Sequence, residues 1–163
     1  MEDLEGLLDR YRLHQLAAAL PKYQANGANI TDTIWDDGCS FDIDVSIKGF
    51  VNIFKNRSLY NVDFLMKRQY MYFAKKQLLP IPISPGCILL PIRIRRPIGD
   101  RDGAYGYVSC DQIDRVRPYV NGQWRSIVAL KDIETEIPTM MNYRQLSQQW
   151  VITDSICDRY FQM

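Results

Sequence analysis

The stretch CILLPIRIRRPIGDRDGAYGYVSC, residues 87–110, decides the fold class of this chain. Its opening run, 87–91, is short and apolar and follows three closely spaced prolines, which is typical of a buried strand. Residues 92–95 continue it with strict alternation of isoleucine and arginine, the period of a half-buried strand. The composition of 96–103 predicts a loop, and 105–110 predicts the returning strand. The sequence therefore predicts a β-hairpin with arginines along one arm and at its tip.

The arginines of this hairpin are the sharpest functional feature of the sequence. Alternation places the two isoleucines on the core side and turns the arginines to the other face. Arginines on a two-stranded ribbon can enter a DNA groove, and a narrow A·T-rich minor groove attracts them through its negative potential. The alternative is an ordinary solvated hairpin in which the loop aspartates pair with the arginines. The residues predicted to read DNA are Arg93, Arg95, Arg96 and Arg101.

Further strands are predicted on both sides of this hairpin. Residues 30–35 and the alternating segment 41–47 predict a second hairpin with one buried face. Asn121-Gly122 is a strong turn signal before the strand 124–130. The preceding segment, 111–117, also alternates, and the basic residues that share one of its faces are Arg115 and Arg117.

An amphipathic helix is predicted at the N-terminus. Leu4, Leu7, Leu8 and Tyr11 have the spacing of one apolar helical stripe, and the alanines before Pro21 extend the helix over residues 1–22. The stripe is too apolar to remain solvated. It either completes the core of the domain or pairs with a second copy of the chain in a homo-oligomer.

Two further helices are predicted in the middle and at the C-terminus of the chain. Residues 58–77 carry helical spacing, with a strand over 70–73 as the competitor, and helical spacing returns at 142–160. The middle helix would carry a basic cluster suited to phosphate contacts: Lys67, Arg68, Lys75 and Lys76.

Length and composition fit one domain spanning 1–163. The chain has 163 residues, of which 47% are hydrophobic and 24% charged, and these are globular values. The predicted fold class is α+β: mainly antiparallel hairpins forming a sheet, with N-terminal, middle and C-terminal helices.

The formal net charge of +1 conceals an uneven distribution. Residues 1–54 carry nine acidic and four basic side chains, and residues 132–163 carry five acidic and two basic. The middle, 55–131, carries fourteen basic and five acidic side chains, a net charge of +9. A basic middle favours a negatively charged partner, of which nucleic acid is the commonest. The alternative is that the acidic ends fold against the middle and neutralise it.

Several function classes lack the residues that they need. The only histidine is His14, which leaves almost no material for a Ser-His-Asp triad or a histidine-based zinc site. No phosphate-binding or dinucleotide motif occurs, and we expect a protein without enzymatic activity, cofactor or metal. The four cysteines are scattered, which predicts reduced thiols in the cytoplasm, and no apolar stretch is long enough to predict a membrane span.

Between residues 36 and 159 the order of these features resembles the ComK family, the competence transcription factors of Gram-positive bacteria. The resemblance rests on Asp37-Gly38-Cys39-Ser40-Phe41, the Arg57-Ser58 to Lys67-Arg68 stretch, the proline-flanked strand 80–92, Gly106-Tyr107-Val108-Ser109, and an Asn-Gly turn before 137–143. It implies binding of A/T-rich promoter DNA by dimers or higher oligomers that reach into the minor groove. The predicted N-terminal helix is not an obvious family feature, and the charged C-terminal extension of the family is not matched.

The sequence thus predicts a cytoplasmic, homo-oligomeric DNA-binding regulator of transcription, similar to the competence factors, that contacts A/T-rich duplex DNA with its arginine-rich hairpin. Two alternatives remain. One is a protein-interaction module, such as an adaptor or inhibitor, whose basic face binds an acidic partner. The other is a single-stranded nucleic-acid binder, because aromatic residues accompany the basic ones.

Overall fold

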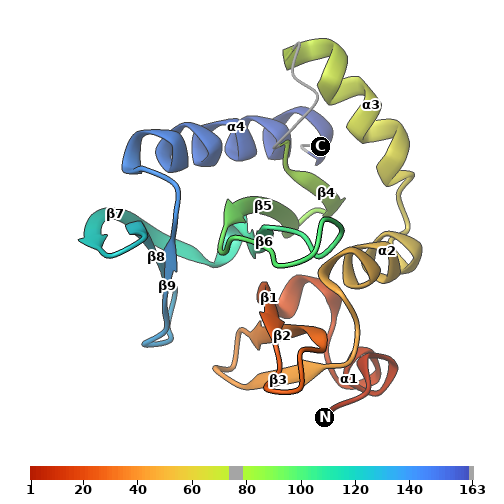
Figure 1. Ribbon diagram of the computed structural model, residues 1–163. Helices are drawn as coiled ribbons and strands as arrows, with labels where there is room; N and C mark the ends of the chain where they lie inside the picture. Colours follow the sequence, from red (N-terminus) through yellow and green to blue (C-terminus); the bar gives the residue numbers. More distant parts are fainter. Residues whose placement is uncertain (74–78, 162–163) are drawn as a thin grey trace.

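The computed structural model describes residues 1–73 and 79–161, and within them the chain forms an α+β fold of four α-helices and two antiparallel sheets (Figure 1). The larger sheet consists, in sheet order, of β3 (Ser40–Ile43), β2 (Asn29–Trp35), β1 (Leu16–Tyr23), β6 (Tyr105–Ser109), β5 (Cys87–Arg93) and β4 (Ile81–Ser84). The smaller sheet consists of β7 (Ile113–Asn121), β8 (Trp124–Leu130) and β9 (Glu136–Thr139). The helices are α1 (Leu4–Arg10), α2 (Ile47–Arg57), α3 (Val62–Phe73) and α4 (Tyr143–Phe161), with 3₁₀ turns η1 (Leu13–Gln15) and η2 (Cys110–Gln112). The predicted fold class is confirmed.

The hairpin predicted from 87–110 is the centre of this architecture. β5 and β6 pair antiparallel from Leu89–Ser109 to Arg93–Tyr105, and β6 continues the sheet by pairing with β1. Ile92 is fully buried, as the alternation requires. The β7–β8 hairpin is also confirmed, and Gly122 adopts the positive φ, 62°, that its tight turn needs.

The larger sheet is covered on both faces. One face packs against α1 and α2, whose Leu7, Phe50 and Phe54 share a buried cluster with Trp35 of β2. The opposite face packs against the smaller sheet and α4, which contributes Leu146 to that core. Figure 1 shows the smaller sheet to the left of the larger one and α1 and α2 to its right. The two sheets therefore share a core.

The predicted N-terminal helix over 1–22 is wrong in its extent. α1 covers only Leu4–Arg10, and the alanine-rich segment is instead strand β1 in the middle of the larger sheet. Helix propensity favoured alanine, but pairing with a strand on each side outweighs the small propensity of three residues. The apolar stripe itself completes the core, because Leu4 and Leu7 are buried in it.

The predicted strand over 41–47 is also too long. β3 ends at Ile43, and the helix α2, which begins at Ile47, was not predicted. Ser46 caps this helix, since its Oγ accepts a hydrogen bond from Gly49 N at 3.2 Å. The middle helix is confirmed as α3, which begins at Val62 rather than at 58 and is helical over 70–73, whereas 74–77 lie outside the described residues. The C-terminal helix is confirmed as α4. None of the described helices is both long and apolar enough to cross a membrane.

Candidate nucleic-acid interface

The end of β5 meets the connection between β9 and α4. Met140 N donates a hydrogen bond of 2.8 Å to Arg93 O, which ties the edge of the smaller sheet to the last residue of β5. Two residues further on, Asn142 caps α4, because its Oδ1 accepts a hydrogen bond of 2.8 Å from Gln145 N. These two contacts fix the start of α4 beside Arg93, the last residue of β5.

A polar groove opens at this junction, and we call it the arginine groove. It has a volume of about 430 Å³, and three arginines from two distant parts of the chain line it: Arg93 at the end of β5, Arg96 in the following loop, and Arg125 in β8. Amide side chains accompany them, from Gln123, Asn142 and Gln145. No carboxylate is found among the described residues that line the groove.

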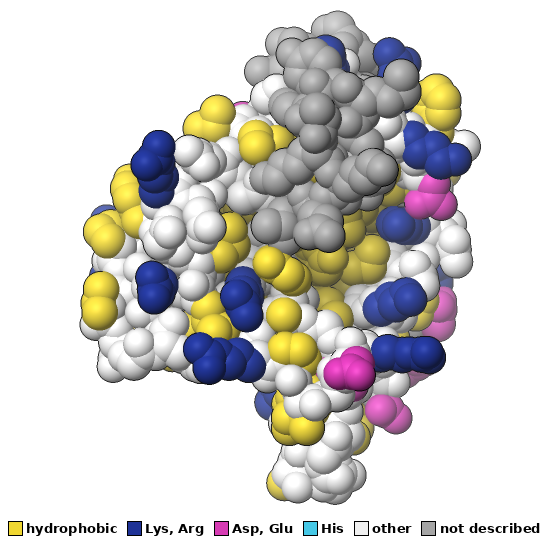
Figure 2. All heavy atoms as spheres, turned by 45° about the horizontal axis from the view of Figure 1, so that its top comes forward, with side chains coloured by type: hydrophobic (Ala, Val, Ile, Leu, Met, Phe, Trp, Pro, Cys, Tyr) yellow, Lys and Arg dark blue, Asp and Glu magenta, His cyan; other side chains and the backbone are white. Residues whose placement is uncertain are grey.

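The guanidinium groups of Arg93, Arg96 and Arg125 are exposed, and they form no ion pair with any residue that the structure describes. Five other basic side chains of the described residues do pair with a carboxylate, as Lys22 does with Asp42. In Figure 2 the dark blue side chains on the left of the molecule lie among white and yellow atoms, whereas several on the right adjoin magenta ones. Folding therefore leaves the charge of this groove uncompensated, and guanidinium groups match phosphate oxygens with paired hydrogen bonds.

Arg95 does not lie with Arg93, contrary to the prediction from alternation. β5 ends at Arg93, so the two-residue period stops there and the side chain of Arg95 turns back over the loop. Its Nε donates to Gly103 O at 2.9 Å, and its Nη2 donates to Asp102 O and Asn29 Oδ1, both at 2.7 Å. Arg95 is therefore a structural anchor that holds the loop between β5 and β6, which carries Arg96, against the β1–β2 hairpin.

Tyr23 completes this anchor. The Arg95 guanidinium lies 4.1 Å from the centre of its ring, and its hydroxyl donates to Asp102 Oδ2 at 2.5 Å while accepting from Ile98 N at 2.8 Å. Burial lowers the pKa of Arg95, opposed by the charges of Tyr23 and Asp102. The Tyr23 hydroxyl, followed by Gly99 N, holds the pKa of Asp102 below its usual value. Asp102 thus fixes the loop and does not pair with any exposed arginine that the structure describes.

The structure places the remaining predicted contact residues outside the groove. Arg101 is exposed in the β5–β6 loop, and Arg115 is exposed on β7, whereas Arg117 pairs with Glu136 at 2.8 Å. α3 carries Lys67 and Arg68 exposed, on the opposite side of the molecule from the smaller sheet in Figure 1. Two predicted residues, Lys75 and Lys76, lie outside the described residues.

Arg125 is the groove residue that the sequence reasoning missed. It stands three residues after the glycine of the Asn-Gly turn, on the hairpin that also carries Arg117. Because residues next to a hairpin turn are usually exposed, the exposure of Arg125 could have been predicted from its position in the sequence. Its approach to Arg93 depends on the pairing of β8 with β9 and on the Met140–Arg93 contact, which local periodicity does not report.

Comparisons of the chain with protein-family models, with curated proteins and with solved structures found no match. The resemblance to the competence factors therefore remains a prediction from sequence features, and the groove has to be interpreted from its own geometry.

Proposed function

We propose that the protein binds duplex DNA and acts in transcriptional control, with the arginine groove on the sugar-phosphate backbone. The observation that carries this proposal is the convergence of Arg93, Arg96 and Arg125 without a carboxylate among them. Uncompensated guanidinium groups gathered in one groove suit the negatively charged backbone of a duplex, and each phosphate contact releases a condensed counterion. A rim of amide side chains can add hydrogen bonds to sugar and phosphate oxygens.

The ion pairs within the described residues support this proposal over internal neutralisation. Only two pairs join an acidic end of the chain to the basic middle, Arg57 with Glu5 and Arg117 with Glu136, and neither contains a groove arginine. The charge asymmetry of the sequence therefore persists on the folded surface at this junction.

The finer part of the proposal follows the resemblance. We propose a homo-oligomer that prefers A/T-rich duplex and inserts Arg96 and Arg101 into the minor groove, while Arg93 and Arg125 contact phosphates. Arg96 and Arg101 are suited to this role because both are exposed in the loop that Arg95 anchors. A regulator of this kind would act in the cytoplasm of a bacterial cell.

A competition measured by fluorescence anisotropy tests the proposal. A labelled A/T-rich duplex is displaced from the wild-type protein by unlabelled A/T-rich duplex, G/C-rich duplex or single strand of equal length. We expect the A/T-rich duplex to compete best, and Arg96→Ala with Arg101→Ala to reduce its advantage over the G/C-rich duplex. Absence of duplex binding at physiological salt would overturn the proposal and favour an acidic protein partner.

A further inference from the structure

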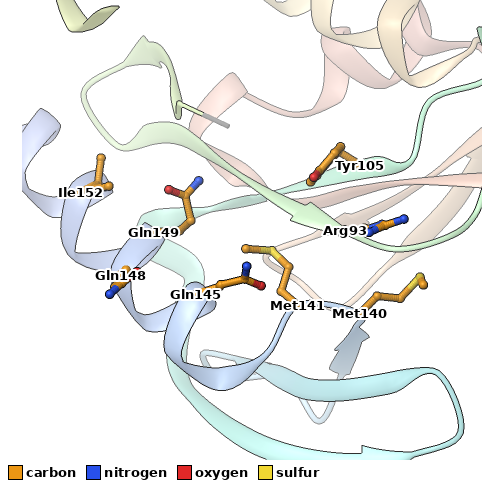
Figure 3. A pocket seen from close by; sticks show the side chains of 8 residues that line it. All are labelled: Arg93, Tyr105, Met140, Met141, Gln145, Gln148, Gln149 and Ile152. Carbon is orange, nitrogen blue, oxygen red and sulfur yellow. The ribbon is translucent and has the colours of Figure 1, made fainter. Parts of the chain in front are cut away.

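A second pocket adjoins the arginine groove, and we call it the glutamine pocket. It has a volume of about 290 Å³ and lies between α4 and the ends of β5 and β6 (Figure 3). Three residues line both sites: Arg93, Met140 and Gln145. The two hollows are therefore neighbouring parts of one larger site, cationic at one end and neutral at the other.

The walls of the glutamine pocket combine amides with apolar and aromatic surface. Gln145, Gln148 and Gln149 project from α4, and Tyr105 faces them from β6 across the pocket (Figure 3). Thioether and aliphatic side chains, including Met141, complete the lining. Arg93 is the only charged residue among the described residues that line it.

We propose that the two sites together bind one nucleoside phosphate unit, with the phosphate on the guanidinium groups of the arginine groove and the base in the glutamine pocket. A glutamine amide offers both a donor and an acceptor, which is the pattern needed to pair with the polar edge of a base. The Tyr105 ring and the thioethers of Met140 and Met141 offer the flat or deformable apolar surface that base faces contact. No simple anion needs such a neutral extension of its site.

The walls of the pocket determine whether a stacked or an unstacked base can bind in it. Helix α4 forms one wall and the β5–β6 strands form the other, so the base must enter between them. A base within a duplex is stacked on both faces, and removing it has an unstacking cost. The unit that fits is therefore a free nucleotide or an unstacked nucleotide of a single strand.

This inference rests on the proposed function to the extent that Arg93 serves both sites. The two can nevertheless fail separately. Gln145→Leu with Gln148→Leu changes the amide wall and leaves all three groove arginines in place. Both glutamines are exposed on α4, so leucine of similar size keeps the helix.

Isothermal titration calorimetry tests the base site. The wild-type protein is titrated with each of the four nucleoside 5′-monophosphates and with ribose 5-phosphate, which has the phosphate but no base. We expect at least one nucleotide to bind about tenfold more tightly than ribose 5-phosphate, the gain of roughly one good amide–base contact. The double leucine variant should lose that advantage and keep its affinity for ribose 5-phosphate. Asn52→Leu, an exposed amide on α2 that lines neither site, is the matched control.

Equal affinity for ribose 5-phosphate and for all four nucleotides would overturn the base site, as would an unchanged nucleotide preference in the double variant. A short single strand that binds more tightly than its mononucleotide, and loses that affinity in the double variant, identifies a nucleic-acid strand as the source. Equal affinity of strand and mononucleotide identifies a free nucleotide. A wild-type protein that binds duplex DNA but does not distinguish the four nucleotides from ribose 5-phosphate would refute this inference alone.

Discussion

Replacing Arg95 by alanine should destabilise the protein, whereas replacing its neighbour Arg96 should not. Arg95 donates three hydrogen bonds, to Gly103 O, Asp102 O and Asn29 Oδ1, at 2.7–2.9 Å. At about 1 kcal/mol of net stability each, these contribute roughly 3 kcal/mol, and the stacking on a tyrosine ring adds about 0.5–1 kcal/mol. Because the side chain is only half-buried, we expect a loss of about 2–4 kcal/mol in the free energy of unfolding.

Thermal unfolding followed by circular dichroism measures this difference. For a chain of this size each kcal/mol lowers Tm by about 2–4 °C, so Arg95→Ala should lower Tm by about 5–15 °C. The exposed Arg96 forms no described ion pair, and Arg96→Ala should stay within about 0.5 kcal/mol of wild type. Arg95→Lys should recover only part of the loss, because an ammonium group lacks the planar fork. Equal Tm values for Arg95→Ala and Arg96→Ala would refute the anchor.

Three further outcomes are expected. Gly106→Ala should lower the free energy of unfolding, measured in urea, by about 1–3 kcal/mol. A Cβ at this position would lie 2.9 Å from a carbonyl oxygen of β1, which cannot move without disturbing the sheet. An unchanged urea midpoint would contradict this. Cys39 is exposed, whereas burial raises the pKa of the Cys87 thiol to about 12. Iodoacetamide at pH 8 should therefore label Cys39 in the folded protein and Cys87 only after unfolding, and peptide mass spectrometry measures both. The hydrogen bond from Tyr11, followed by that from Cys39 N, lowers the pKa of Asp37. The stability that the Asp37 carboxylate contributes is therefore present above the ordinary carboxyl pKa near 4, and it is lost as the pH falls through the lower pKa of the folded state. Tyr11→Phe should therefore be less stable than wild type at pH 7 and approach it in acid, and a difference that persists unchanged at pH 2 would rule out this linkage.

The elements that could be predicted from the sequence are those with a clear local period. α3 and α4 have helical spacing over several turns, the β5–β6 hairpin combines an apolar run with a short alternating segment and a loop composition, and the structure confirms all three elements. β1 lacked such a signal, because three consecutive alanines fit a helix and a strand equally well by pattern. Its neighbours in the sheet, β2 and β6, decide its conformation, and β6 follows it by some eighty residues.

The candidate site was predictable only in part, for a related reason. Alternation identified Arg93 as exposed, but it assigned Arg95 the same role because the period was continued past the end of β5. Nothing local indicated that Arg125 meets Arg93, since their approach depends on a backbone contact at Met140 between the two sheets. The sequence pattern thus predicted that the β5–β6 hairpin is basic, whereas tertiary contacts determine which arginines line the groove.

The salt dependence of duplex binding tests the central claim most directly. Affinity is measured between about 50 and 200 mM salt for the wild type, for Arg93→Ala with Arg96→Ala and Arg125→Ala, and for a control triple of Arg10→Ala, Lys48→Ala and Lys131→Ala. The two triples remove equal charge, but the control residues line neither pocket of the site. We expect the slope of log K against log salt to become shallower by about two units in the groove triple, one for each arginine placed on a phosphate, and by less than about one unit in the control. Equal slopes for the two triples would contradict the assignment of the arginine groove as the DNA-binding site.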